Sequence, residues 1–139
     1  MRLPELSEGI SLPEVKRLVT QENINLYAEV STDFNPIHID PEYAKKTPAG
    51  GTIAHGMLLL AYISQMMTAA FGRNWLSGSS LSVRFRTPAR PGNTLTVSGT
   101  IRKVTEDNDQ KLVNCEILCQ NQNGDPVITG EAKVKVGKQ

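Results

Sequence analysis

Residues 56–71 read Gly-Met-Leu-Leu-Leu-Ala-Tyr-Ile-Ser-Gln-Met-Met-Thr-Ala-Ala-Phe, and Gly72 follows them. The run is apolar nearly all round, which is typical of a helix that is buried in a protein core. Gly72 is a natural C-terminal stop for such a helix. The apolar stretch is also shorter than the roughly 20 residues that a membrane-spanning helix needs. We therefore expect a central core helix over residues 56–71.

Downstream of this helix, apolar and polar residues alternate in four successive segments, with turn residues between them. The apolar residues that share a face in each segment are Leu81, Val83 and Phe85; Leu95, Val97 and Ile101; Val113, Cys115, Ile117 and Cys119; and Ile128, Ala132, Val134 and Val136. This period of two predicts an antiparallel sheet with one apolar face. An apolar helix and a one-sided sheet complement each other, so we expect an α+β fold in which the sheet wraps around the helix.

Upstream of the helix we expect a loose N-terminal arm over residues 1–11, followed by a single domain over residues 12–139. Capping residues and first-turn prolines indicate short elements at the start of that domain. These elements are a strand within 12–19, a helix over about 21–30 after Thr20, a short helix over about 41–46, and a loop over 47–54.

The composition excludes several classes of function. The 139 residues carry a net charge of +1 and 5% aromatic side chains, which gives no indication of nucleic-acid or anionic-membrane binding. The first residues lack the basic-then-apolar order of a secretory signal peptide, so we expect a cytoplasmic protein. Cys115 and Cys119 would lie about 13 Å apart on one strand face at roughly 3.3 Å per residue, which is too far for a disulfide. We expect two buried thiols.

Residues 33–40 read Asp-Phe-Asn-Pro-Ile-His-Ile-Asp, and Pro36 within them disfavours a helical conformation of the residue before it. We therefore expect a rigid, extended loop that aims Asp33 and His38 into one cavity. A carboxylate and an imidazole placed in this way can act together on one water molecule. The N–H of Gly56, at the start of the central helix, can stabilise a developing oxyanion.

Each of these residues also has a structural interpretation. Asp33 taken alone is often a turn residue that bonds its own backbone, and Asn35 fits a turn as well as a role in orienting water or substrate. A histidine at position 55 starts a helix, where the helix dipole disfavours an imidazolium, so we expect His55 to be structural. Gly56 could simply allow a tight turn, and the Ser64 hydroxyl could bond the carbonyl one turn back.

Residues 27–38, Tyr-Ala-Glu-Val-Ser-Thr-Asp-Phe-Asn-Pro-Ile-His, closely resemble the signature of the MaoC-like, (R)-specific enoyl-CoA hydratases. The resemblance continues through residues 55–58, His-Gly-Met-Leu, and through residues 85–93, Phe-Arg-Thr-Pro-Ala-Arg-Pro-Gly-Asn. It implies the hot-dog fold, in which an antiparallel sheet wraps a long central helix. One position departs from the pattern, because Thr32 stands where the family usually has glycine.

The resemblance also implies roles for individual residues. Asp33 and His38 would activate a water molecule, and Gly56 would donate to the oxyanion. Asn35 would support this pair, and Ser64 would lie close to it. Apart from the resemblance, the bulky side chains of Phe34 and Met57 are expected to close the substrate-binding site. The implied reaction is the reversible hydration of a trans-2-enoyl-CoA to an (R)-3-hydroxyacyl-CoA, and it needs no metal and no organic cofactor. The thioester carrier is coenzyme A or acyl carrier protein, and the implied assembly is a homodimer or a higher even-numbered oligomer.

Two other interpretations stay open at this point. A hot-dog acyl-CoA thioesterase would share the fold and the thioester site, although the loop with Asp33 and His38 favours a hydratase. A non-catalytic, acyl-thioester-binding subunit of a hot-dog complex is the other alternative. Both members of the catalytic pair are present, so this chain would be the active subunit of such a complex.

Overall fold

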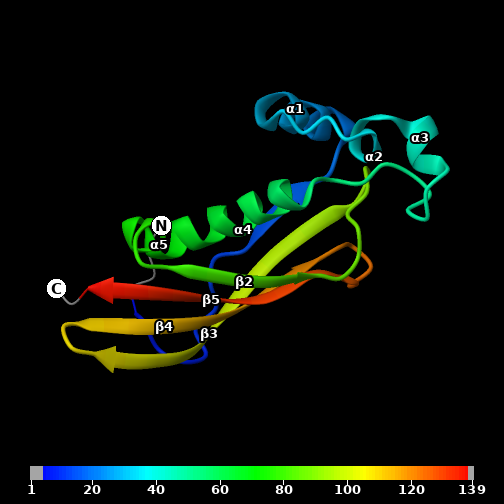
Figure 1. The fold of residues 1–139 in the computed structure, drawn as a ribbon. Coiled ribbons are helices and arrows are strands. Elements are labelled where there is room, and N and C mark those ends of the chain that lie inside the picture. Colours follow the sequence, from blue (N-terminus) through cyan, green and yellow to red (C-terminus); the bar gives the residue numbers. More distant parts are fainter. Residues whose placement is uncertain (1–4, 138–139) are drawn as a thin grey trace.

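The computed structural model describes residues 5–137, which form one five-stranded antiparallel sheet and five helices. The strand order is β1-β3-β4-β5-β2, and α4 lies across one face of the sheet (Figure 1). The elements are β1 (Val15–Leu18), α1 (Gln21–Ser31), α2 (Pro36–Ile39), α3 (Pro41–Lys45), α4 (Gly56–Phe71), α5 (Arg73–Leu76), β2 (Ser80–Phe85), β3 (Thr94–Asp107), β4 (Gln110–Gln120) and β5 (Pro126–Gly137).

The four predicted strands after α4 are confirmed, and their apolar residues face the helix. On β4, for example, Val113, Cys115, Ile117 and Cys119 are all buried, whereas the residues between them are less so. Burial raises the pKa of the Cys115 thiol to about 12 and that of Cys119 to about 11. Both cysteines are unpaired, as expected from their spacing. The sheet therefore presents one continuous apolar face.

The central helix is confirmed over its predicted bounds, but it is not buried all round. Its sheet-facing side chains are buried, and Ile63, Met66 and Met67 are fully so. The opposite stripe of the helix is exposed in the single chain: it consists of Met57, Ala61, Gln65 and Thr68. The sheet covers one face of the helix only, so the expectation of complete burial is wrong for this stripe.

The expected loose arm is also corrected for the part that the structure describes. The N–H of Gly9 donates to the Ile101 carbonyl at 2.8 Å, and the N–H of Ile101 donates to the Ile10 carbonyl at 2.9 Å. Leu12 continues this pairing with Gly99 and is buried. Residues 9–12 are therefore bonded to β3, because its edge offers backbone groups that need partners. Residues 1–4 of the predicted arm lie outside the described residues.

Residues 20–54 form a helical lobe beyond the start of α4, at one end of the body that the sheet, α4 and α5 make (Figure 1). The predicted helix starts in the lobe are confirmed by their caps. The Thr20 hydroxyl accepts a hydrogen bond from the Asn23 N–H at 3.0 Å. Asp40 accepts from the N–H groups of Glu42 and Tyr43 at 3.1 and 3.2 Å. Side chains thus satisfy the free N–H groups at these helix starts.

No helix within residues 5–137 combines the length and the apolar character that crossing a bilayer would require.

Candidate active site

The segment that carries the predicted catalytic pair is partly helical rather than fully extended. Asn35 itself is extended, as the following proline requires, with φ −55° and ψ 128°. Its side chain, however, accepts from the Ile37 N–H at 3.1 Å and caps the one-turn helix α2, in which Pro36 is the first residue. An asparagine cap followed by proline is a helix-start signal. His38 therefore projects from a helical turn, and the prediction of an extended loop is wrong for residues 36–39.

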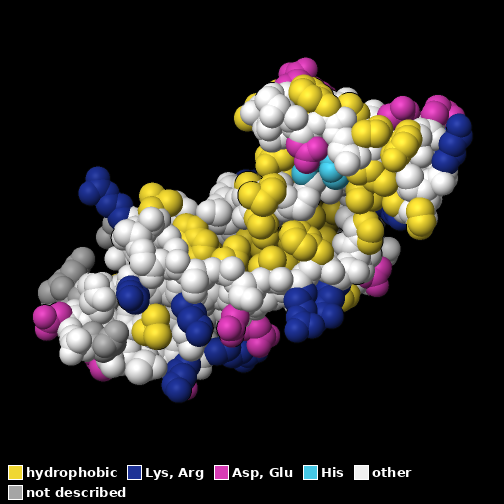
Figure 2. Space-filling view, in the orientation of Figure 1, with side chains coloured by type: hydrophobic (Ala, Val, Ile, Leu, Met, Phe, Trp, Pro, Cys, Tyr) yellow, Lys and Arg dark blue, Asp and Glu magenta, His cyan; other side chains and the backbone are white. Residues whose placement is uncertain are grey.

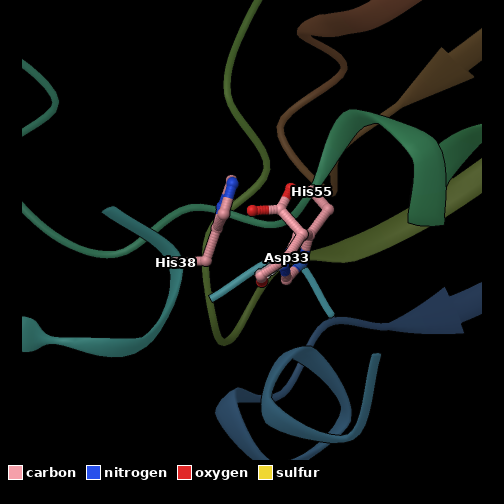
Figure 3. Close-up of side chains that lie close together, drawn as sticks. All are labelled: Asp33, His38 and His55. Carbon is pink, nitrogen blue, oxygen red and sulfur yellow. Dashed lines mark hydrogen bonds between the residues drawn. The ribbon is translucent and has the colours of Figure 1, made fainter. Parts of the chain in front are cut away.

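Asp33 and His38 nevertheless come together, and His55 joins them (Figure 3). One oxygen or nitrogen atom from each of the three side chains lies within 4.8 Å of the others. A water molecule at about 2.8 Å from each of two groups can bridge groups up to about 5.6 Å apart. Asp33 is exposed, His38 is half-buried and His55 is only 2% exposed. The cluster thus has the spacing to hold one water molecule at an accessible position.

Backbone carbonyls select the proton positions of both imidazoles. The Nδ1 atom of His38 lies 2.8 Å from the Ile53 carbonyl oxygen, and Nε2 of His55 lies 3.0 Å from the Asp33 carbonyl oxygen. A carbonyl can only accept, so each of these nitrogens carries the hydrogen. His38 therefore keeps Nε2 free to take a proton, which is the state that a general base needs.

The His55 ring contacts the rings of both His38 and Tyr27. It stacks on His38 with centroids 3.8 Å apart and 25° between planes, and it contacts the Tyr27 ring at 4.8 Å. Its Nδ1 atom is buried and has no hydrogen-bond partner among the described residues. The predicted structural role is compatible with these contacts, but sequence reasoning missed that His55 touches both His38 and the Asp33 backbone.

The geometry of the cluster suits a water molecule better than a metal ion. Imidazole lone pairs lie in the ring plane, and a metal such as zinc sits about 2.0–2.1 Å from its nitrogen ligands. The nearly parallel stacking of His38 and His55 directs their lone pairs side by side rather than onto one point.

The local turn around Asp33 fixes the position of its carboxylate. One carboxylate oxygen accepts from the Asn35 N–H at 3.2 Å, and the Asp33 N–H donates to the Ser31 hydroxyl at 3.2 Å. Thr32 ends α1 in the left-handed region, with φ 63° and ψ 18°. Asp33 can therefore both stabilise the turn and take part in the site. One of its carboxylate oxygens accepts the hydrogen bond from Asn35, and the carboxylate lies beside His38.

An apolar hollow of about 320 Å³ opens beside His38, between the helical lobe and the sheet. Figure 2 shows the histidine atoms at the rim of this apolar region. The walls include Gly56, Leu59, Phe85 and Ala89. A Cβ atom at position 56 would lie only 3.0 Å from Cζ of Phe85, so the glycine lets the ring and the helix start approach closely. The first N–H groups of a helix have no intrahelical acceptor, so the Gly56 N–H is available to a ligand.

The remaining predicted substrate residues are Phe34, Met57 and Ser64. Phe34 and Met57 are large, exposed side chains next in sequence to Asp33 and Gly56. Ser64 lies about 12 Å along the helix from Gly56, at 1.5 Å per residue. Its hydroxyl accepts a hydrogen bond from the Trp75 indole at 2.8 Å rather than joining the cluster. The substrate roles of these residues stay predictions.

Three residues that the structure places at the site had no assigned role in the sequence. Ile53 accepts from His38, Phe85 lines the hollow, and Gln21 bonds the His38 carbonyl at 2.7 Å. Phe85 belongs to the third stretch of family resemblance, residues 85–93, which was the one signal available for it. Gln21 lies 17 residues before His38, and Ile53 lies 15 residues after it. No pattern in the sequence indicates that either residue contacts His38.

A larger groove of about 430 Å³ lies on the polar face of the sheet and contains none of the predicted catalytic residues. Four positive and two negative side chains line it, all of them exposed: Arg84, Arg86, Arg102, Lys103, Glu116 and Glu131. Arg102 binds the Glu116 carboxylate with two hydrogen bonds of 3.1 Å. Exposed charged side chains of both signs are typical of a solvated sheet face. His38 and Gly56, by contrast, line the smaller hollow.

Comparison with known proteins identifies the fold. Solved (R)-hydratases superpose on this helix and sheet, and the chain is a hot-dog protein of the hydratase and dehydratase class. The chain belongs to the MaoC-like domain family, whose model matches residues 9–121.

Several of the similar proteins are named as hydratases or dehydratases. The (R)-specific enoyl-CoA hydratase of Rhodospirillum rubrum is 31% identical over 132 residues, which cover 95% of this chain and 89% of that protein. The mitochondrial 3-hydroxyacyl-[acyl-carrier-protein] dehydratase of Arabidopsis thaliana is 34% identical over 84% of this chain and 69% of that protein. The solved (R)-hydratase of Aeromonas caviae superposes with a TM-score of 0.79 at 27% identity, over 96% of this chain and 99% of that one.

Proposed function

We propose that this protein catalyses the reversible hydration of a trans-2-enoyl-CoA to an (R)-3-hydroxyacyl-CoA, with Asp33 and His38 activating the water. The observation that carries the proposal is the placement of Asp33 and His38 within 4.8 Å of each other, beside an apolar hollow that also reaches Gly56. The named activities of the similar proteins support the same reaction class.

The reaction adds the elements of water across the C2–C3 double bond. The pair takes a proton from the bound water, the water oxygen bonds to C3, and the electrons of the double bond move toward the thioester oxygen. A proton from the pair then reaches C2. The Gly56 N–H would hold the thioester oxygen while it carries negative charge, which is the step where a fixed donor helps most. The Nε2 atom of His38, left free by the Ile53 carbonyl, fits the role of proton carrier.

The other predicted residues complete the substrate site in this proposal. Asn35 fixes the turn between Asp33 and His38 through its cap and its N–H. Phe34 and Met57 would close over a small acyl group, and Ser64 would lie deeper along the helix. Both coenzyme A and acyl carrier protein are compatible carriers, since relatives named for each are similar to this chain.

The decisive experiment is hydration of crotonyl-CoA by the purified chain, followed by the loss of absorbance of the conjugated double bond. We expect turnover without added metal or cofactor. No turnover with crotonyl-CoA, together with release of free thiol from a saturated acyl-CoA, would replace the hydratase by a thioesterase.

The stereochemistry of the product tests the site geometry. Because Asp33 and His38 lie within 4.8 Å of each other, one water held between them should deliver its oxygen to C3 and a proton to C2 on the same face. The Gly56 N–H would fix which face of the double bond is presented, and the resemblance to the (R)-hydratases favours the (R)-3-hydroxy isomer. The product can be offered to (R)- and (S)-specific 3-hydroxyacyl-CoA dehydrogenases. Oxidation by the (S)-specific enzyme alone would refute the proposed geometry.

We further propose that the chain forms a homodimer or a higher even-numbered oligomer. Within residues 5–137, the edge strands β1 and β2 each pair with a strand on one side only, and open edges are a liability unless they are paired. Several large apolar side chains are exposed in the single chain, among them Leu26, Val30 and Met57. Light scattering at micromolar concentration should give an even multiple of the chain mass, and a stable monomer would refute this assembly.

A further inference from the structure

One glutamine side chain joins the three segments that meet around His38. Gln21 is the first residue of α1 and is half-buried. Its Nε2 atom donates to the His38 carbonyl at 2.7 Å and to the Asn25 side chain at 2.9 Å. Its Oε1 atom accepts from the hydroxyl of Thr52, a residue that is only 8% exposed, at 2.7 Å. Both amide hydrogens and the amide oxygen of Gln21 are therefore used.

These bonds close a ring of contacts around the His38 imidazole. Gln21 holds the main chain of His38 on one side and Thr52 on the other. The residue after Thr52 is Ile53, whose carbonyl accepts from the His38 ring at 2.8 Å. The N–H of Ile53 also donates to the Ile37 carbonyl at 3.2 Å. The position of the Ile53 carbonyl relative to the His38 backbone is thus set by this backbone bond together with the two bonds of the Gln21 amide.

We propose that Gln21 is a positioning residue that keeps His38 in the Nδ1–H tautomer, with Nε2 directed to the water. The effect of Gln21 on turnover rests on the function proposed above. The tautomer depends on the Ile53 carbonyl staying within hydrogen-bond distance of Nδ1. A carbonyl that moves away leaves the other tautomer free to form, and that tautomer has no lone pair on Nε2 to accept a proton. Displacements of about 1 Å are known to cost up to about 10²-fold in rate.

Two substitutions remove the link in different ways. Gln21→Met keeps the length of the side chain but removes all three hydrogen bonds, and Thr52→Val removes only the bond to the loop. We expect kcat for crotonyl-CoA to fall about 10-fold in Gln21→Met, which is less than the full effect of misplacing a catalytic group. The fall in kcat should be smaller in Thr52→Val. KM should change little, because neither residue lines the hollow. Gln65→Met, on the exposed stripe of α4, is the matched control and should keep the wild-type kcat.

A second measurement reads the tautomer without any substrate. The chain has two histidines, so nitrogen-15 NMR of the full-length protein gives two ring systems, and His38→Gln assigns them. Wild-type His38 should show a protonated Nδ1 and an unprotonated Nε2, and Gln21→Met should show a mixture of tautomers. Thr52→Val loses a single hydroxyl, so it keeps this test available if Gln21→Met does not fold.

The outcomes separate the two proposals. Unchanged His38 nitrogen shifts in both folded variants would overturn the positioning role, whatever happens to the activity. Altered shifts together with a lower kcat would support it. A wild-type protein without hydratase activity would refute the proposed function, while the nitrogen shifts would still decide whether Gln21 positions His38.

Discussion

The body and the helical lobe are held in place by different kinds of interaction. In the body, the sheet and α4 bury a continuous set of apolar side chains, such as Ile63, Met66 and Val97. In the lobe, the buried apolar side chains of the three helices are Ile24, Ala28 and Ala44. The lobe is fixed instead by side chains that bond nearby backbone groups, at the starts of α1, α2 and α3 and around the turn at Asp33.

This difference matters because the site lies where the two regions meet. Asp33 and His38 come from the lobe, and Gly56 comes from the body. Apolar burial is non-directional, so it holds α4 firmly but does not aim a side chain. Hydrogen bonds fix direction as well as distance, and they set the orientation of His38. Substitutions in the lobe should therefore lower mainly the catalytic activity, and substitutions in the body should lower mainly the free energy of unfolding.

The largest effect should follow from changing the catalytic pair in the lobe. We expect Asp33→Asn and His38→Ala each to lower kcat with crotonyl-CoA by at least about 10²-fold, the usual scale for a positioned acid or base. Asparagine can still accept from the Asn35 N–H, so circular dichroism and the thermal midpoint should change little. Glu29→Gln, on the exposed side of α1, is a control that should keep wild-type turnover. Near-wild-type turnover in either variant would contradict the assigned roles.

The matching change in the body should affect stability instead. Ile63 is fully buried on α4, and Ile63→Ala should lower the free energy of unfolding by about 2–5 kcal/mol because it removes apolar contacts and leaves a cavity. Glu29 on α1 is exposed, and Glu29→Ala should stay within about 0.5 kcal/mol of wild type. Urea denaturation followed by circular dichroism measures both. Equal losses in the two variants would contradict the proposed difference between the regions.

The same contrast explains what the sequence could predict. The body follows from periodicity: alternation along residues such as Val113 and Cys115 predicts the strands, and the apolar run predicts α4. The exposed stripe with Met57 and Ala61 could not be predicted in this way, because composition does not say how much of a helix one sheet can cover. Pairing of residues 9–12 with β3 was missed because backbone groups made those bonds and no side-chain pattern marks them.

The pairing of the site residues was predictable, but their geometry was not. The Asn-Pro segment between Asp33 and His38 indicated that these two side chains share one cavity, and the structure brings them together with His55. The helical turn at Pro36 was missed, although an asparagine followed by proline is a cap signal as well as a turn signal. Gln21 and Ile53 were missed because their bonds to His38 join distant segments, and only the folded chain brings these together.

The junction between the two regions is tested by Gly56→Ala. An added methyl group would lie 3.0 Å from the Phe85 ring and would narrow the hollow where the thioester oxygen is proposed to bind. We expect kcat/KM for crotonyl-CoA to fall about 10-fold, a part of the effect of losing an oxyanion donor. The Phe85 side chain is 56% exposed and can shift, so the thermal midpoint should change little.

Gly51→Ala is the matched glycine control, because its added methyl group would meet the Arg90 side chain at an ordinary 3.6 Å. It should leave kcat/KM unchanged. An equal fall in both variants, or no fall in Gly56→Ala, would argue against a thioester oxygen at the Gly56 N–H.

The smallest effect should come from the strained turn that leads to Asp33. Thr32 has φ 63°, and a side chain in the left-handed region costs roughly 1–2 kcal/mol, whereas glycine adopts it freely. Glycine loses roughly 0.5–1 kcal/mol more backbone entropy on folding, so Thr32→Gly should stabilise the protein by about 0.5–1 kcal/mol in urea denaturation. Thr32→Ala is the control: it also loses the hydroxyl bond to the Ser31 carbonyl but keeps the strained backbone, and it should be less stable than Thr32→Gly.

The activity of Thr32→Gly should change little. Because glycine can adopt the same backbone angles as Thr32, Asp33 should stay in place, and kcat should remain within about twofold of wild type. A Thr32→Gly protein no more stable than Thr32→Ala would show that the backbone at Thr32 carries no strain, and a large loss of kcat would show that the threonine side chain itself helps to hold Asp33.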